Sequence, residues 1–356
     1  MKVQQINNCN EEKKVLTQEG CEKLLKLVAD AEKIVVVSHQ NPDGDALGSV
    51  LGMSAWLRMK GKQPTMVLPD AYPDFLQWMP LANTIMRFDK KREEVATAIT
   101  EADLIFCVDF NEYGRVGDEM SEVLKAYNGE MIHIDHHIGP NLNADIVISE
   151  TEASSACELV FKLIWQLGDF DKLDRLFYVP VFAGIMTDSG CFEYANTSPE
   201  TFVIVSELLK KGVDRVKIRR NIYDTFSQWR LRLQGYVLYK KLVVFPHQHA
   251  SYFTLTKEDL FRFHFIKGDA EGLVNLPLQM KGHKLSISLR EDTVKPNLVW
   301  VSARSIDNIP CNEICAKFFN GGGHMNASGG RLFCSIDEAA KIAEKAIKDF
   351  EEVLTK

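Results

Sequence analysis

The fold is decided by the stretch IVVVSHQNPDGD, residues 34–45. Its first four residues are apolar and β-branched, which is typical of a short strand buried on both faces. Polar residues, a proline and a glycine follow at once. Residues 46–57 then carry small and apolar side chains, which we expect to form a helix against the sheet. A strand that leads through a loop into a helix is the repeating unit of an open α/β sheet.

The same pattern recurs along the first two-thirds of the chain. Further strands are predicted at 65–68, 104–108, 131–134 and 179–186. An amphipathic helix is predicted at 153–167, with Thr151 and Ser154 as candidate caps and Gly168 as its stop. Strands that alternate with helices predict an open, mostly parallel sheet flanked by helices.

The last third of the chain has a different pattern, which predicts a smaller α+β domain. Strands are expected at 242–245, 250–255, 285–289 and 298–303, and helices at 313–319 and 336–351. Residues 228–241 are helical in pattern and rich in Arg and Lys. The predicted organisation is a catalytic domain over 1–224, a connecting helix over 225–241 and a second domain over 242–356.

Acidic residues and histidines follow four of the predicted strands, at the point where each strand ends. In chain order they are His39, Asp43 and Asp45; Asp109; Asp135, His136 and His137; and Asp188. The carboxyl ends of parallel strands lie along one edge of a sheet, where such sheets bind ligands. We therefore expect these side chains to converge in one cleft.

The chemistry of this set favours a metal site. The candidate ligands are His39, Asp43, Asp45, Asp109, His136 and Asp188. Carboxylates packed together repel one another unless a cation neutralises them, and this donor set suits Mn²⁺ or Mg²⁺. Two such ions would promote hydrolysis at phosphorus, because one would activate a water and both would neutralise the developing negative charge. A single aspartate after a strand is commonly a cap or turn residue, so it is the repetition at four strand ends that favours metal binding.

These residues resemble the DHH phosphoesterase superfamily over nearly the whole chain. The matching motifs are SHQNPDGDALGS (38–49), VDF (108–110), IDHH (134–137) and TDSG (187–190), while GGGHMNASGG (321–330) resembles the signature of the associated DHHA1 domain. Length and domain order are similar to the bacterial nanoRNase and pAp-phosphatase branch, which is RecJ-like and exopolyphosphatase-related. No motif position departs from the family pattern.

The resemblance implies an active site in the cleft between the two domains. One manganese ion would be held by His39, Asp43 and Asp109, and the other by Asp45, Asp109, His136 and Asp188. Asp109 would bridge the two ions, for which Mg²⁺ or Co²⁺ are alternatives. In the catalytic set of Asp135, His136 and His137, Asp135 would orient an imidazole. His137 would contact the scissile phosphate and could protonate the leaving oxygen.

Glycines of the last third are candidates for substrate binding. Gly321, Gly322 and Gly323 permit positive φ, and their amides could form an anion-binding nest, with a flexible turn as the alternative. The resemblance implies that this loop and nearby side chains grip the terminal phosphate or base of the substrate. The further candidates are Arg290, Arg304, His324 and Ser328, with Arg115 as a weaker one. Each arginine could instead be a solvated surface residue.

Composition and charge argue against several classes of protein. The 356 residues carry a net charge of −7, which gives no broad basic surface for long duplex nucleic acid. The longest β-branched apolar run is far too short to cross a bilayer, and residues 1–18 have no secretory pattern, so we expect a cytoplasmic protein. The eight cysteines show no disulfide framework. Cys311 and Cys315 are interpreted as neighbours one helical turn apart rather than as a zinc pair.

The predicted function is hydrolysis of short oligoribonucleotides to 5′-mononucleotides, of pAp to AMP, or of both, through a metal-activated water. The alternatives are a linear or cyclic dinucleotide phosphodiesterase, a polyphosphate or pyrophosphate hydrolase, and a non-catalytic nucleotide sensor. Short RNA, pAp or dinucleotides are the expected partners, without long duplex nucleic acid or membrane. A homodimer through the helix at 153–167 is left open, although burial of that helix in the core is favoured.

Overall fold

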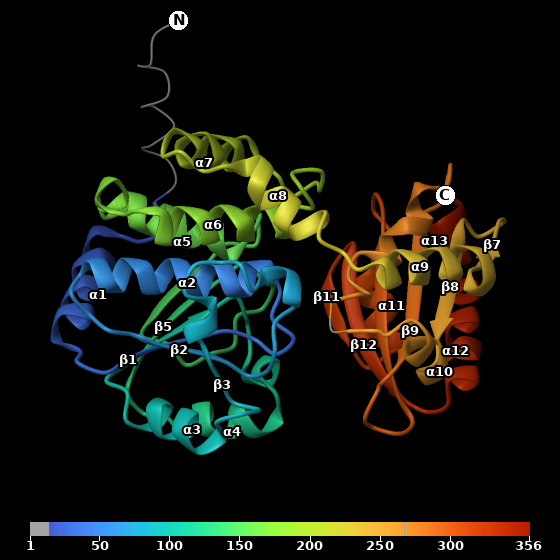
Figure 1. Ribbon diagram of the computed structural model, residues 1–356, viewed down its shortest axis with the longest axis horizontal. Coiled ribbons are helices and arrows are strands. Elements are labelled where there is room, and N and C mark those ends of the chain that lie inside the picture. Colours follow the sequence, from blue (N-terminus) through green and yellow to red (C-terminus); the bar gives the residue numbers. More distant parts are fainter. Residues whose placement is uncertain (1–13, 267) are drawn as a thin grey trace, which may run out of the picture. The chain divides into compact units, whose positions relative to one another are not determined.

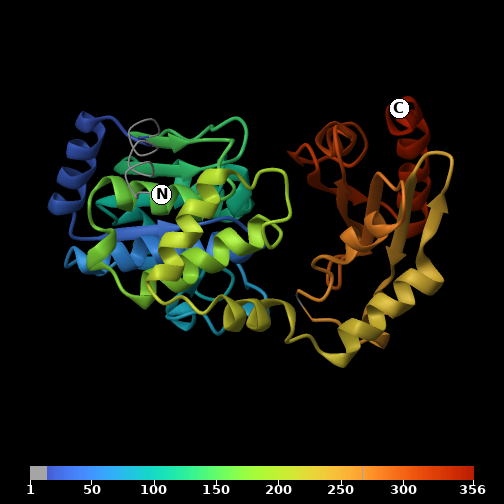
Figure 2. The same cartoon turned by 90° about the horizontal axis from the view of Figure 1, so that it is seen from above.

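The computed structural model describes residues 14–266 and 268–356. The chain divides into two compact units, one ending at Thr225 and the other spanning Phe226–Lys356 (Figure 1, and from above in Figure 2). Most of residues 1–18, for which no secretory pattern is predicted, lie outside the described residues. Cys9 also lies outside them. The domain roles expected for the two parts of the chain remain predictions.

The first unit contains a six-stranded sheet in the order β3-β2-β1-β4-β5-β6, with every neighbouring pair parallel. Its strands are β1 (Ile34–Val37), β2 (Thr65–Leu68), β3 (Met86–Arg87), β4 (Leu104–Val108), β5 (Glu130–Asp135) and β6 (Ile146–Ser149). The expected parallel α/β sheet is confirmed. The edge strands β3 and β6 were not predicted, because two and four residues are too short to give a periodic pattern. The strand order reverses between β1 and β4, the position where open sheets bind ligands.

Helices cover both faces of this sheet (Figure 1). They are α1 (Gln18–Asp30), α2 (Gly44–Met59), α3 (Arg92–Thr100), α4 (Asp118–Lys125), α5 (Ala156–Gln166) and α6 (Arg175–Asp188). Helix α7 (Pro199–Lys210) packs on α5 and α6 from outside, and α8 (Arg215–Tyr223) contacts α6 (Figure 1). Alternate residues of β1 enter two different cores. Ile34 and Val36 pack with residues of α2, α5 and α6, whereas Val35 and Val37 pack with residues of α3 and α4. Burial on both faces explains the unbroken apolar run that predicted this strand.

The prediction of a strand at 179–186 is wrong, because these residues lie within helix α6. The helix is buried on nearly all sides, so its sequence lacks the polar face that would show a helical period. Glycines allow α2 and α6 to pack closely: a Cβ on Gly48 would lie 2.6 Å from the carbonyl oxygen of Pro180. Asp188 therefore lies at the end of a helix rather than of a strand.

The second unit contains another six-stranded sheet, in the order β11-β12-β10-β9-β8-β7. All neighbouring pairs are antiparallel except β8 with β9. Its elements are α9 (Gln228–Tyr236), a π-helical segment (Val237–Lys241), β7 (Val243–Phe245), β8 (Ala250–Leu255), α10 (Lys257–Arg262), β9 (Leu285–Glu291), β10 (Leu298–Ser305), α11 (Cys311–Phe318), β11 (Gly322–His324), β12 (Ala327–Phe333), α12 (Ile336–Asp349) and α13 (Glu351–Thr355). Helices α11 and α12 share a core with β9 and β10. The second sheet domain is thus confirmed as mixed α and β.

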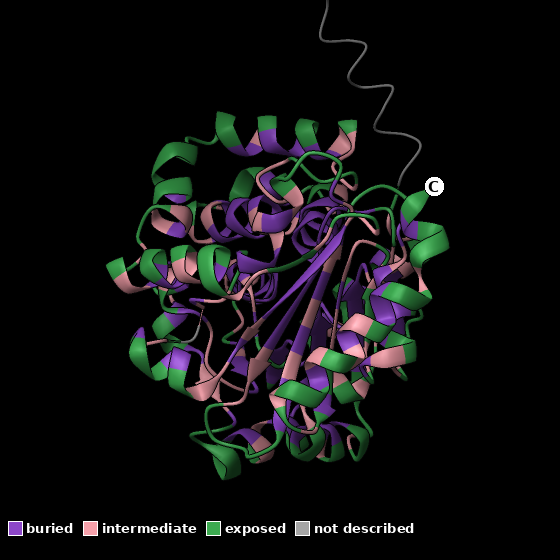
Figure 3. Cartoon of the chain, turned by 90° about the vertical axis from the view of Figure 1, so that its right-hand side faces the viewer, coloured by how far each residue is buried: buried purple, intermediate pink, exposed green. Residues whose placement is uncertain are grey.

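Burial follows the elements in both units. Figure 3 shows strands that are mostly buried and outer helices with one buried and one exposed side, whereas α2 and α6 are buried along most of their length. The helix expected at 153–167 is observed as α5, and its residues Leu159 and Leu163 are fully buried, as core packing predicts. None of the helices within the described ranges is long and apolar enough to span a membrane. The seven cysteines that the structure describes are free thiols, and Cys311 and Cys315 lie one turn apart on α11.

Candidate metal centre

The loop after β1 and the first turn of α2 supply three acidic or imidazole side chains: His39, Asp43 and Asp45. His39 and Asp45 are buried, at 5% and 1% exposure. Asp43 is the N-cap of α2, and its Oδ1 accepts hydrogen bonds from the amides of Asp45 (2.9 Å) and Ala46 (3.0 Å). The cap uses one oxygen of Asp43 and leaves the other free for a ligand.

Asp109 lies at the centre of the site, directly after β4. Its backbone has a φ of 64°, a left-handed conformation that costs energy for a non-glycine residue and is characteristic of functional positions. Each of its carboxylate oxygens faces a different imidazole. Oδ2 lies 3.2 Å from Nε2 of His39, and Oδ1 lies 3.5 Å from Nε2 of His136. One carboxylate therefore joins two groups of potential ligands.

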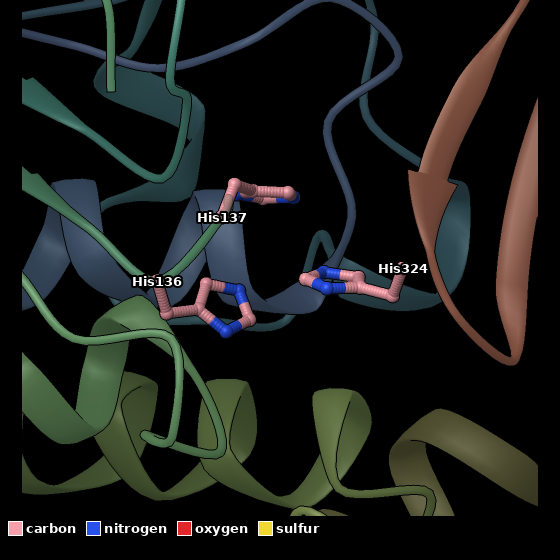
Figure 4. A group of neighbouring side chains, drawn as sticks. All are labelled: His136, His137 and His324. Carbon is pink, nitrogen blue, oxygen red and sulfur yellow. The ribbon is translucent and has the colours of Figure 1, made fainter. Parts of the chain in front are cut away.

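His136 follows β5, next to His137 (Figure 4). Besides Asp109, its Nε2 lies 3.5 Å from Oδ2 of Asp188 and 3.8 Å from Oδ2 of Asp45. Its Nδ1 lies 3.3 Å from the carbonyl oxygen of Ala153, and a carbonyl can only accept a hydrogen bond. In the neutral ring Nδ1 therefore carries the proton, and the lone pair on Nε2 faces the carboxylates.

His39 is oriented in the same way. Its Nδ1 lies 2.9 Å from the carbonyl oxygen of Gln40, so Nε2 faces Asp109: it donates to that carboxylate when the ring is doubly protonated, and its lone pair is available to a cation when the ring is neutral. Two sets of three ligand atoms thus lie within 4.8 Å of one another: His39, Asp43 and Asp109 form one, and Asp45, Asp109 and His136 form the other. The structure brings all six predicted ligands together, with Asp188 next to His136.

The electrostatics of the cluster show the need for positive charge. Burial raises the pKa of Asp45 well above its ordinary value, and the charges of Asp109 and Asp188 add to the effect. Burial also raises the pKa of Asp188, to about 7. For Asp109, burial raises the pKa, but hydrogen bonds from His136 and His39 outweigh it and bring the pKa well below the ordinary value. Without cations, the cluster holds protons that free carboxylates would release.

The donor atoms suit divalent cations. The candidate groups among the described residues consist of carboxylate oxygens and imidazole nitrogens, with no thiolate. Such donors fit hard or borderline divalent ions rather than thiophilic ones. The site is therefore chemically able to hold metal at two adjacent positions.

Asp135 and His137 form a separate pair beside this cluster. Oδ1 of the fully buried Asp135 accepts a hydrogen bond from Nδ1 of His137 at 2.7 Å. The opposite ring atom, Nε2, lies 3.5 Å from Nη2 of Arg115, which belongs to a short 3₁₀ helix (Tyr113–Val116). The imidazole that Asp135 orients is thus that of His137.

Sequence reasoning missed the backbone groups that support the ligands. The N-cap of α5 is Ser155, not the predicted Thr151 or Ser154, because the Ser155 side chain accepts the amide of Glu158. Beyond this cap, the amides of Ala156 and Cys157 bind the two oxygens of Asp45. A helix N-terminus is suited to a carboxylate, but no side chain at these positions reveals it.

The remaining predicted residues lie in the second unit. Gly322–His324, part of the predicted anion-binding loop, forms strand β11 and pairs with β12. Gly321 and Gly323 permit close backbone approach: a Cβ on Gly321 would overlap the carbonyl oxygen of Gly329, and one on Gly323 would lie 2.8 Å from the carbonyl oxygen of Ala327. The Ser328 hydroxyl donates to the carbonyl oxygen of His324 at 2.7 Å.

The two predicted arginines of this unit lie on neighbouring strands. Arg290 lies 5.3 Å from the ring centroid of Phe265, and Nη1 of Arg304 donates to the carbonyl oxygen of Ala303 at 3.0 Å. Neither contact involves a carboxylate. The assignment of these arginines and of the glycine-rich hairpin to substrate binding remains a prediction.

Comparisons with known proteins agree with this architecture. A family model described as the DHH family, N-terminal domain, matches residues 33–185. The chain is 30% identical to the bifunctional oligoribonuclease and PAP phosphatase NrnA of Thermus thermophilus, over 91% of this chain and 94% of that protein. It is 26% identical to the cyclic-di-AMP phosphodiesterase GdpP of Geobacillus thermodenitrificans, over 92% of this chain and 49% of that protein. The crystal structure of an exopolyphosphatase-related protein from Bacteroides fragilis is 43% identical, with a TM-score of 0.90, over 97% of this chain and 100% of that chain.

Proposed function

Because the chain belongs to the DHH family, we propose that it is a metal-dependent phosphoesterase that hydrolyses short oligoribonucleotides to 5′-mononucleotides and pAp to AMP. The relative from Thermus thermophilus bears the name of both activities and matches nearly the full length of the chain. The single observation that carries the proposal is the carboxylate of Asp109, whose two oxygens face two separate ligand groups. This is the arrangement that a bridging ligand between two cations requires.

We assign one cation position to His39, Asp43 and Asp109, and the other to Asp45, Asp109, His136 and Asp188. Two divalent ions bound there would activate a water and neutralise charge on the phosphate. Mn²⁺ is the first candidate for these oxygen and nitrogen donors, with Mg²⁺ or Co²⁺ as alternatives.

The chain's own residues supply orientation and proton transfer. Asp135 holds the Nδ1 proton of His137, so Nε2 is the ring atom left to face a substrate. When His137 is doubly protonated, Nε2 can donate to the leaving oxygen. Arg115 lies beside that atom and can donate to a non-bridging phosphate oxygen from the same side. Asp135 and Arg115 thus act on the two ends of one imidazole.

A cyclic or linear dinucleotide is the second candidate substrate. The observation that favours it is the similarity to a cyclic-di-AMP phosphodiesterase across 92% of this chain. The chain spans 49% of that relative, so the comparison concerns the shared part alone.

The proposal is tested by a hydrolysis panel. The wild-type protein, stripped of metal with EDTA and then supplied with Mn²⁺, is incubated with a five-nucleotide RNA, pApA, pAp, cyclic di-AMP and polyphosphate. We expect 5′-mononucleotides from RNA and pApA and AMP from pAp, each only after Mn²⁺ is added. Phosphate release from polyphosphate alone would contradict the proposal. Binding of nucleotides without turnover would instead indicate a sensor.

A further inference from the structure

A single short segment supports two of the assigned ligands. The carbonyl oxygen of Ala153 accepts the Nδ1 proton of His136 at 3.3 Å. Three residues later, the amide of Ala156 donates to Oδ2 of Asp45 at 2.6 Å, and the amide of Cys157 donates to Oδ1 at 2.9 Å. The segment Ala153–Cys157 thereby fixes the ring of one ligand and the carboxylate plane of the other, although these ligands follow different strands.

The side chain of Glu158 forms hydrogen bonds to this segment. Its Oε2 accepts three hydrogen bonds: from the amide of Ser154 at 3.3 Å, from the Ser154 hydroxyl at 2.6 Å and from the Thr201 hydroxyl at 2.8 Å. Glu158 is 1% exposed. Its carboxylate therefore ties the turn before α5 to helix α7.

A carboxylate at this buried position has a cost that only polar contacts offset. Nζ of Lys162 lies 3.8 Å from Oε1 of Glu158, but it is closer to Glu150 (2.8 Å) and Glu200 (3.1 Å). The principal compensation of Glu158 is thus the set of three hydrogen bonds on one oxygen. An apolar side chain would avoid the desolvation cost but could not hold the turn.

We propose that Glu158 is a positioning residue of the metal centre, which sets the affinity of one cation position by holding the segment that orients Asp45 and His136. The inference rests on the proposed function in that these two residues must bind metal. Glu158 touches neither ligand and acts only through the segment Ala153–Cys157. Its effect is therefore confined to the position that contains Asp45 and His136.

The test is calorimetric titration of Mn²⁺ into metal-free wild type, Glu158→Ala and Glu158→Gln. In Glu158→Ala we expect one of the two binding events to weaken by about 10–100-fold, the range for loss of groups that orient ligands. The event assigned to His39 and Asp43 should stay within about threefold. In Glu158→Gln the same event should weaken clearly less than in Glu158→Ala, because the amide oxygen keeps two acceptor lone pairs for the hydrogen bonds that the carboxylate oxygen accepts.

Glu150→Ala is the matched control. Its side chain contacts the same Lys162 but, among the described residues, makes no hydrogen bond to the segment Ala153–Cys157, so both binding events should be unchanged. If Glu158→Ala does not fold, Ser154→Ala replaces it. Loss of the 2.6 Å bond from its hydroxyl should weaken the same binding event by about 3–10-fold.

The outcomes separate this inference from the proposed function. Normal Mn²⁺ affinity in Glu158→Ala or Ser154→Ala, or an equal loss at both positions, overturns the positioning role and leaves the phosphoesterase proposal intact. A Glu158→Gln variant as weak as Glu158→Ala also overturns it, because charge rather than hydrogen bonding would then be decisive. A wild-type protein that binds no Mn²⁺ overturns the proposed function itself.

Discussion

The ligand cluster of the first unit and the arginine-bearing strands of the second unit differ in what their polar groups contact. In the first unit, Asp109 and His136 contact other candidate ligands that are distant in sequence. In the second unit, Arg304 donates to backbone carbonyls of its own and a neighbouring strand, and Ser328 donates within its own hairpin. The first arrangement holds buried negative charge that a cation would neutralise, whereas the contacts of the second do not bring carboxylates together. Substitutions in the first should affect metal and turnover, and those in the second only substrate affinity.

The largest expected effect is in the cluster itself. His136→Ala removes the imidazole that lies within 3.8 Å of Asp45, Asp109 and Asp188. We expect turnover of pAp to fall by about 10³-fold or more, together with loss of one Mn²⁺ position. Initial rates and calorimetry measure the two effects. The exposed His247→Ala is the control, and near-normal turnover in His136→Ala would remove this residue from the site.

A smaller effect on turnover is expected for Asp135, which lies beside the ligand cluster. Asp135→Asn keeps the shape of the side chain but loses the charge that holds the Nδ1 proton of His137. We expect kcat to fall by roughly 10–100-fold while the affinity for Mn²⁺ changes little. A loss of Mn²⁺ affinity as large as the loss of kcat would show that Asp135 orients a metal ligand instead.

A still smaller effect is expected for Arg304 of the second unit. Arg304→Ala should raise KM for pAp and pApA by about tenfold, the value of one charge-assisted hydrogen bond, without altering kcat or Mn²⁺ binding. Arg331→Ala, on the adjacent strand β12, is the matched control. An unchanged KM in Arg304→Ala would exclude this arginine from substrate binding.

The smallest expected effect is the pH dependence of the increase in Tm that Mn²⁺ produces. Asp188 has a pKa of about 7 in the folded, metal-free protein, above the ordinary value of 3.8. Between these values the folded state binds protons that the unfolded chain has released, so the stability of the metal-free protein falls as the pH rises. A cation replaces those protons. The gain in Tm on adding Mn²⁺ should therefore be larger at pH 8 than at pH 5.5, by roughly 3–6 °C. A gain that shrinks as the pH rises would contradict the assignment of Asp188.

Much of this arrangement could be predicted from the sequence because it follows from strand ends. His39, Asp109 and His136 each follow an apolar run that is a strand, and parallel topology brings such positions to one edge. Asp188 was expected on the same grounds, but its apolar run is a helix. A helix buried on all sides and a buried strand look alike in sequence, so periodicity could not separate them.

The backbone groups that contact the ligands Asp45 and His136 could not be predicted from strand ends. The segment Ala153–Cys157 acts through one carbonyl and two amides, which every residue possesses. Gly321 and Gly323 permit close approach of neighbouring backbone, which the sequence does not reveal, while the binding of an anion by the glycines at 321–323 remains a prediction. Residue types reveal side-chain chemistry, whereas these roles depend on backbone geometry that only the folded chain defines.

The most direct measurement is the Mn²⁺ content of wild type and Asp109→Ala after equilibrium dialysis, with Asp118→Ala as an exposed control. We expect two ions per chain in wild type and in the control. Asp109→Ala should retain none at the concentration that saturates wild type, because both positions lose the carboxylate they share. Two ions retained by Asp109→Ala would contradict a shared bridging ligand, and with it the metal centre described for the edge of the sheet.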